Sequence, residues 1–223
     1  ATPFREAERK RITALFSDLS GYTAMSEKLD PEEVKEITSH IFDETKEIIK
    51  KYEGSIEMFA GDGILALFGV PVAHEDDPLR AILAAREIHD FVDSLNPFYE
   101  TTVGRALSMH SGINTGLAVT ADKDPESGTR GVTGDAINLA SRLSDLADSG
   151  DILIGAETFR ASQGQFSFEA LNPVKVKGKS QPIPIYKLQS GSTPPFSNSR
   201  DRRVFSEMEP AQVGLFFTLM TER

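Results

Sequence analysis

Two apolar arms flank a Gly-Asp-Gly tip between Ser55 and Gly69. An Asp-Gly pair between such arms is the strongest short-range sequence signal for a β-hairpin. The hairpin is expected to carry the carboxylate of Asp62 at its tip. Two interpretations of Asp62 are open at this point. The residue serves the turn, because aspartate tolerates the left-handed backbone conformation, or it is a functional carboxylate.

Strand and helix signals alternate on both sides of the hairpin. A β-prone apolar run over 12–16 ends at Asp18, and Asp30-Pro31 begins a helix that runs to Tyr52. After the hairpin the patterns predict a helix from about 78 to Asn96-Pro97, a strand over 105–113 that Asn114-Thr115-Gly116 turns back into 117–120, a helix over 136–147, a strand over 152–154, a helix over 157–162, and strands over 166–176 and 183–188.

This order of elements predicts an α+β fold with an antiparallel or mixed sheet and helices on one face. The expected architecture is a ferredoxin-like βαββαβ core extended by further strands and helices. Residues 1–10 are expected to form a lead-in segment and residues 11–189 the folded domain. Residues 190–223 are expected to be a linker and a C-terminal extension of unknown role, because 191–199 is rich in Gly, Ser and Pro.

Composition excludes several classes of protein. The formal net charge of −10 argues against a nucleic-acid-binding surface, which requires a broad basic patch. The absence of cysteine excludes disulfides and thiolate chemistry and favours a reducing compartment. No apolar run approaches the roughly 20 residues of a membrane span, and the first residues lack the charged-then-apolar order of a signal peptide. A cytoplasmic protein is expected, and a first residue other than Met suggests a piece of something longer.

Asp18 and Asp62 are the first candidate site. In a βαββαβ core the first strand is central and lies beside the hairpin, so both carboxylates should reach the same edge of the sheet. Two close carboxylates repel each other, and a divalent cation such as Mg²⁺ or Mn²⁺ removes this repulsion. The alternative for Asp18 alone is a cap for the turn that follows it.

Two segments are candidates for binding phosphate. Ser20-Gly21-Tyr22-Thr23 leads into a short helix, where backbone N–H groups are free to meet phosphate oxygens. Residues 174–179 alternate apolar and basic, which places Lys177 and Lys179 on one strand face. The alternative for the lysines is a solvated strand edge, where they discourage pairing with other chains.

Asn138 and Arg142 are four residues apart on the predicted helix over 136–147, so both project from one face. Asn can orient a hydroxyl, and Arg can neutralise charge that develops on a phosphoryl oxygen. The alternative is a surface ion pair between Arg142 and Asp145. The four histidines show no metal-ligand spacing and are interpreted as surface or packing residues.

Four motifs in sequence order resemble the catalytic domain of class III adenylyl and guanylyl cyclases, in particular the bacterial branch. The similarity covers about 11–188. The motifs are Phe16-Ser17-Asp18-Leu19-Ser20-Gly21-Tyr22-Thr23, Gly61-Asp62-Gly63 with its apolar arms, Asn138-Leu139-Ala140-Ser141-Arg142 and Lys177-Gly178-Lys179.

The resemblance implies a two-metal enzyme that converts ATP into 3′,5′-cyclic AMP and pyrophosphate. Asp18, Asp62 and the carbonyl of Leu19 would hold two Mg²⁺ or Mn²⁺ ions, and the ribose 3′-hydroxyl would attack the α-phosphate in line. Asn138 would position the ribose and Arg142 would meet transition-state charge. Residues 20–23 together with Lys177 or Lys179 would bind the phosphates. The implied active unit is a homodimer with sites at its interface, joined to a regulatory domain.

Two positions depart from the family. The purine is usually selected by a Lys four residues before the hairpin Asp and by an Asp or Thr three residues before the Gly that precedes the Asn/Arg helix. This chain has Met58 and Gly131 there. Purine selectivity between ATP and GTP is therefore expected to be relaxed. The alternatives are a weak or inactive module for dimerisation or nucleotide sensing and, less favoured because Met58 is not acidic, a guanylyl cyclase.

Overall fold

The computed structural model of the chain describes residues 8–123, 130–176, 181–189 and 191. The strands are β1 (Glu8–Ser20), β2 (Ser55–Ala60), β3 (Gly63–Phe68), β4 (Ser108–Lys123), β5 (Arg130–Thr133), β6 (Ile152–Gly155), β7 (Phe168–Ala170) and β8 (Ile185–Leu188). The helices are α1 (Tyr22–Lys28), α2 (Pro31–Lys51), α3 (Asp77–Val103), α4 (Asp135–Leu146) and α5 (Ala156–Ser162).

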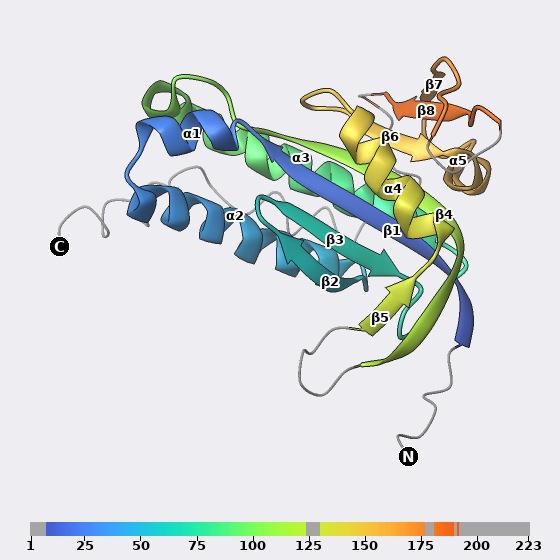
Figure 1. Cartoon of the computed structure of the whole chain (residues 1–223). Coiled ribbons are helices and arrows are strands. Elements are labelled where there is room, and N and C mark those ends of the chain that lie inside the picture. The colour runs from blue at the N-terminus through green and yellow to red at the C-terminus, as the bar shows by residue number, and fades with distance from the viewer. Residues whose placement is uncertain (1–7, 124–129, 177–180, 190, 192–223) are drawn as a thin grey trace, which may run out of the picture.

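The strands form one mixed sheet in the order β2-β3-β1-β4-β6-β8-β7, with β5 paired to β4 (Figure 1). The segment β2-β3-β1-β4 is the strand order of the expected βαββαβ core, with β1 in its middle. All strand pairs are antiparallel except β4 with β6. The prediction of an α+β fold with a ferredoxin-like core is confirmed.

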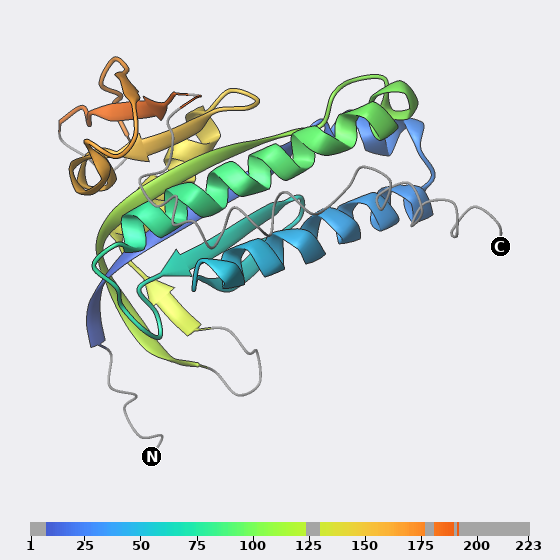
Figure 2. The same ribbon diagram turned by 180° about the vertical axis from the view of Figure 1, so that it is seen from behind.

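Helices cover both faces of the sheet, so the prediction of helices on one face was wrong. Leu15 of β1 belongs to a hydrophobic cluster with side chains of α2 and α3, whereas its neighbour Ala14 clusters with Ala136 and Ala140 of α4. Successive residues of a strand point to opposite faces. The long helices α2 and α3 therefore lie on one face, and α4 lies on the other (Figures 1 and 2).

Helix α2 begins where its cap predicts. Asp30 and Glu33 form a reciprocal capping box at the start of α2. The expected end of α3 at Asn96-Pro97 was wrong, because α3 continues through Pro97 to Val103. Asn96 does not end the helix. Its side chain binds the backbone of Leu107 through two hydrogen bonds of 2.7 and 2.8 Å. None of the described helices is long and apolar enough to span a membrane.

The predicted turn at Asn114-Thr115-Gly116 was also wrong, because β4 passes through these residues without interruption. Asn114 and Gly116 contact α4 where it packs on the strand. The Asn114 Nδ2 donates to the carbonyl of Ala136 at 3.2 Å, and a Cβ atom on Gly112 would clash with the backbone oxygen of Ala140. Gly112, which lies inside the predicted strand, thus allows α4 to approach β4 closely.

Two other strands begin or end at residues other than the predicted ones. The first strand begins at Glu8, inside the expected lead-in, and continues past Asp18 to Ser20. The expected strand over 166–176 reduces to β7 and two isolated bridges, Phe166 with Gln163 and Val174 with Ile183. Residues 177–180, 190 and 192–223 lie outside the described residues, as do 1–7 and 124–129.

Candidate active site

The hairpin tip lies against the C-terminal end of β1. Asp18 of β1 pairs with Gly63, the residue that follows Asp62, and the N–H of Leu19 donates to the backbone oxygen of Asp62 at 3.3 Å. The two aspartates that the sequence placed on one sheet edge are therefore neighbours in the fold. This contact depends on β1 lying beside β3.

The electrostatics of Asp18 fit a cation site. Burial raises the pKa of the Asp18 carboxyl, and the nearby Asp62 carboxylate raises it further, while His110 lowers it. A carboxylate pair whose charges destabilise each other favours a bound cation, and hard oxygen ligands suit Mg²⁺ or Mn²⁺. Within the described part of the chain, no group of three or more acidic or imidazole side chains forms a metal-binding cluster. Any further ligands must come from backbone, water or a bound substrate.

The backbone carbonyl of Leu19 can supply one such ligand. In an antiparallel ladder the N–H and C=O of one residue point to the same neighbouring strand. Because the N–H of Leu19 points to Asp62, its carbonyl is directed to the hairpin side as well. The geometry is compatible with the expected role of Leu19 as a carbonyl ligand.

His110 belongs to this site, and the interpretation of all histidines as surface or packing residues overlooked it. His110 on β4 pairs with Asp18 across the sheet. Its Nε2 lies 3.8 Å from the Asp18 Oδ2, and its Nδ1 lies 3.0 Å from the Ser20 hydroxyl. Only the register between β1 and β4, which are distant in the sequence, brings these groups together.

A second histidine, on α3, contacts the sheet close to this site. His89 of α3 is buried, and its Nε2 lies 2.8 Å from the Ser111 hydroxyl, which in turn lies 2.7 Å from that of Ser17. Desolvation lowers the pKa of His89 to about 4, although a hydrogen bond to the backbone of Gly150 opposes this shift. The neutral ring thus connects α3 to both central strands next to Asp18.

The burial of His89 predicts a loss of stability in acid. The unfolded residue binds a proton near pH 6.5, whereas the folded residue does so only near pH 4. Between these values the unfolded state binds more protons, so stability is complete above about pH 6.5 and falls by roughly 3 kcal/mol towards pH 4. Urea unfolding from pH 8 to pH 4 measures this loss.

His89→Gln is the control, because it keeps a polar side chain and removes the titration. Its free energy of unfolding should depend less steeply on pH over the same range. Equal pH dependence in the two proteins would contradict a neutral buried His89.

Asn138 and Arg142 lie on the solvent-exposed side of α4, as the spacing predicts. Arg142 Nη1 binds the Asp145 Oδ2 at 3.1 Å, which is the surface pair that the sequence offered as the alternative. An exposed pair of this kind contributes only about 0.3–0.5 kcal/mol, so it does not prevent Arg142 from binding another group. Within the described chain neither Asn138 nor Arg142 contacts either aspartate.

Met58 faces the same side of the sheet as Asp18. A bulge in β2 shifts the register so that Met58 pairs with Leu65, which pairs in turn with Phe16 of β1. Directly opposed residues share a face, and Phe16 and Asp18 are two apart. Met58 is 47% exposed and offers no hydrogen-bonding group stronger than its thioether. Gly131 lies in β5 and has only backbone to offer.

The phosphate-binding candidates differ in how far the structure describes them. Residues 20–23 join β1 to α1, whose first helical residue is Tyr22, and Gly21 takes a positive φ of 101° in this sharp turn. The side chain of Ser20 is engaged by His110. Lys177 and Lys179 lie outside the described residues.

Comparisons with known proteins identify the family of the chain. The profile of the adenylate and guanylate cyclase catalytic domain matches residues 4–190. Adenylate cyclase 1 of Rhizobium meliloti (strain 1021) is 29% identical over 187 residues, and the adenylate cyclase of Anabaena cylindrica is 32% identical over 198 residues. Each match covers 82% of this chain, which spans only 28% and 38% of the lengths of these two relatives.

Two solved structures are similar over most of the chain. The adenylyl cyclase CyaB from P. aeruginosa is 29% identical with a TM-score of 0.78, and the match covers 82% of this chain and 96% of that one. The guanylyl cyclase Cya2 is 33% identical with a TM-score of 0.77, and the match covers 86% and 97%. Because the family profile also covers 4–190, the chain belongs to the adenylate and guanylate cyclase catalytic domain family.

Proposed function

We propose that the chain is the catalytic domain of a metal-dependent adenylyl cyclase that converts ATP into cyclic AMP and pyrophosphate. The observation that carries this proposal is the contact between the end of β1 and the hairpin tip, which holds Asp18 beside Asp62. A purely structural tip would not need a second carboxylate, that of Asp18, whose pKa is raised by burial and further by Asp62.

Each residue of the site has a role in this reaction. Asp18, Asp62 and the carbonyl of Leu19 would hold divalent cations, which lower the pKa of the ribose 3′-hydroxyl and neutralise phosphate charge. Asn138 orients the ribose, and Arg142 stabilises the charge that develops as the α-phosphate is attacked. Residues 20–23, Lys177 and Lys179 bind the phosphates.

The active unit in this proposal is a homodimer. Asn138 and Arg142 face solvent on α4 and reach neither aspartate of their own chain. A second copy related by a two-fold axis would supply the missing half to each site. The chain spans only a small part of the length of its curated relatives. We therefore propose that the full-length protein also contains a regulatory domain.

A product assay tests the function. The purified chain is incubated with ATP or GTP in Mg²⁺ and in Mn²⁺, and cyclic AMP and cyclic GMP are separated by chromatography. Cyclic AMP as the main product is the expected result. A protein that binds nucleotide without forming either product would instead be a nucleotide-sensing module, the candidate that the apolar Met58 favours. Cyclic GMP as the main product would identify a guanylyl cyclase.

Met58→Lys is expected to raise the preference for ATP over GTP. The new ammonium would donate a hydrogen bond to a ring acceptor of adenine, and one such contact changes discrimination by about tenfold or more. The measurement is the ratio of kcat/KM for the two nucleotides.

Val72→Lys is the matched control, because Val72 is an exposed apolar residue outside β2, and there the ratio should not change. An unchanged ratio in Met58→Lys would place Met58 away from the base.

A further inference from the structure

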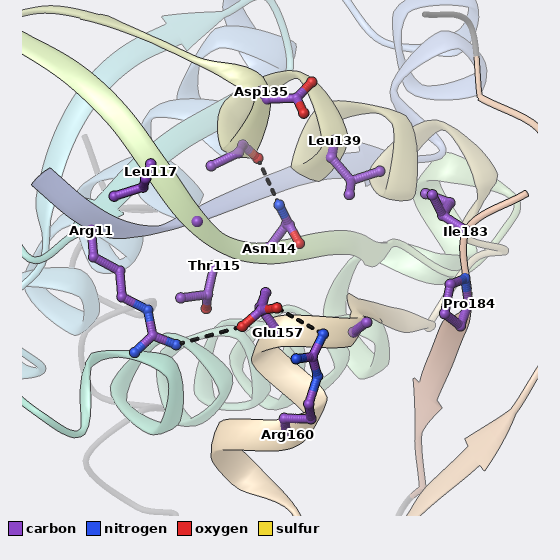
Figure 3. A pocket seen from close by; sticks show the side chains of 13 residues that line it. Arg11, Asn114, Thr115, Leu117, Asp135, Leu139, Glu157, Arg160, Ile183 and Pro184 are labelled. Carbon is purple, nitrogen blue, oxygen red and sulfur yellow. Dashed lines mark hydrogen bonds and ion pairs between the residues drawn. The ribbon is translucent and has the colours of Figure 1, made fainter. Parts of the chain in front are cut away.

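A cavity of about 480 Å³ lies on the α5 side of β4, apart from the aspartate site. Figure 3 shows β4 as its floor, α4 as one wall and α5 as the other, with Pro184 and Ile183 at one end. Its volume lies in the range of pockets that hold small organic molecules. None of the residues assigned to nucleotide or metal binding lines it.

The cavity lies beside a stretch of β4 that neither β5 nor β6 covers. The parallel strand β6 pairs with β4 only over Ser111, Gly112 and Ile113, and β5 pairs only from Val119 onward. Between them, in the described part of the chain, β4 has a strand partner only on the β1 side. This leaves a short free strand edge facing the cavity.

The free edge presents backbone hydrogen-bonding groups. The N–H of Ser111 donates to the backbone oxygen of Asp151, so the backbone groups of Ser111 point to the β6 side. With a period of two, those of Thr115 and Leu117 point the same way, into the cavity. An unpaired strand edge is a template for an amide group of a ligand.

Two arginine side chains lie at the mouth of the cavity. Two arginines, Arg11 from β1 and Arg160 from α5, converge on the single carboxylate of Glu157, at 3.9 and 2.7 Å (Figure 3). The longer distance leaves Arg11 only weakly engaged. The other lining carboxylate, Asp135, lies on the α4 wall across the cavity from Arg160 (Figure 3). The three charged groups at the mouth carry one net positive charge.

The wall opposite the arginines is largely apolar and carries one carboxylate, that of Asp135. Ala136 and Leu139 of α4, with Ile183 and Pro184, line it. Fixed cations on one side and apolar side chains on the other suit a ligand with a charged end and an apolar body.

We propose that this cavity binds a small carboxylate that also carries an amide and a branched apolar group, such as an N-acylated amino acid. The carboxylate lies between Arg11 and Arg160, where guanidinium groups accept it in bidentate geometry. The amide pairs with the edge of β4 at Thr115 and Leu117, and the apolar group packs on Leu139. The ligand then contacts the inner side of α4, the helix that carries Asn138 and Arg142.

N-acetyl-L-leucine is the probe, and N-acetyl-L-leucinamide is its neutral isostere. Titration into the isotopically labelled chain should shift the amide resonances around Thr115, Leu117 and Leu139, with a Kd on the order of 1 mM for a ligand of this size. The neutral isostere should bind at least about tenfold more weakly, because it forms no charge-assisted hydrogen bonds with the arginines.

Variants at the mouth should change affinity in opposite directions. Arg160→Gln should weaken binding of the acid about tenfold, whereas Glu157→Gln should tighten it several-fold, because it frees both arginines and removes a competing carboxylate. Arg105→Gln, the same charge change at an exposed position outside the cavity, should have no effect. Equal binding of acid and amide, resonance shifts outside the cavity, or weaker binding to Glu157→Gln would each overturn the proposal. None of these readouts depends on cyclase activity.

Discussion

Asp62→Asn is expected to reduce cyclic nucleotide formation by about 10³-fold or more, because metal stabilisation of the reacting phosphate contributes several kcal/mol. The loss should persist in saturating Mn²⁺, since an amide is a poorer ligand than a carboxylate. Asp43→Asn, an exposed carboxylate on α2 that is bound to Lys46, is the matched control and should keep wild-type activity.

The same substitution should stabilise the metal-free protein. The Asp62 carboxylate raises the pKa of the partly buried Asp18, which means that the two charges destabilise the fold when no cation is bound. Removing one charge should therefore raise the thermal unfolding midpoint in EDTA at pH 7. Activity and stability thus move in opposite directions at a metal ligand. A variant that lost stability and kept activity would show that Asp62 only serves the turn.

Two inactive variants are expected to restore activity when their chains are mixed. Asp62→Asn removes the metal half of the site and Arg142→Ala removes the α4 half, so each homodimer should be inactive. If each site combines halves from two chains, random pairing gives half heterodimers with one intact site out of two, and activity should recover to about a quarter of wild type. Cyclic AMP formation is measured after the chains are unfolded together and refolded.

The control mixes Arg142→Ala with Asn138→Ala. Both substitutions lie on α4, in the same half of the site, so their mixture should remain inactive. Recovery in that mixture, or none in the first, would show that the site is assembled within one chain. In that case α4 would have to move, because Arg142 is bound to Asp145 and does not contact the aspartates.

The sequence correctly predicted the features that depend on only a few consecutive residues. The hairpin tip at Gly61-Asp62-Gly63 and the start of α2 at Asp30-Pro31 are both present as predicted. A turn or a cap is specified by the backbone preferences and side-chain hydrogen bonds of a few consecutive residues. The spacing of Asn138 and Arg142 on one side of α4 follows from helical geometry in the same way.

The turn and the helix end that Gly, Asn and Pro predicted were wrong, because contacts with distant segments determine the structure at those positions. Asn114 and Gly116 read as turn residues, yet β4 continues through them where α4 packs on it. Pro97 reads as a helix end, yet the helix continues past it. The cost of one lost backbone hydrogen bond at Pro97 is outweighed by contacts that no short window of sequence contains.

The sequence by itself determined the set of reactive groups, the elements that carry them and the family to which their order corresponds. Only the tertiary structure decided which groups meet. The antiparallel pairing of Glu8–Ser20 with 108–120 sets His110 beside Asp18, and the end of β6 at Gly155 opens the cavity that Arg11 and Arg160 line. Strand register between distant segments depends on how both sheet faces pack, and a shift by one residue would send every side chain to the other face.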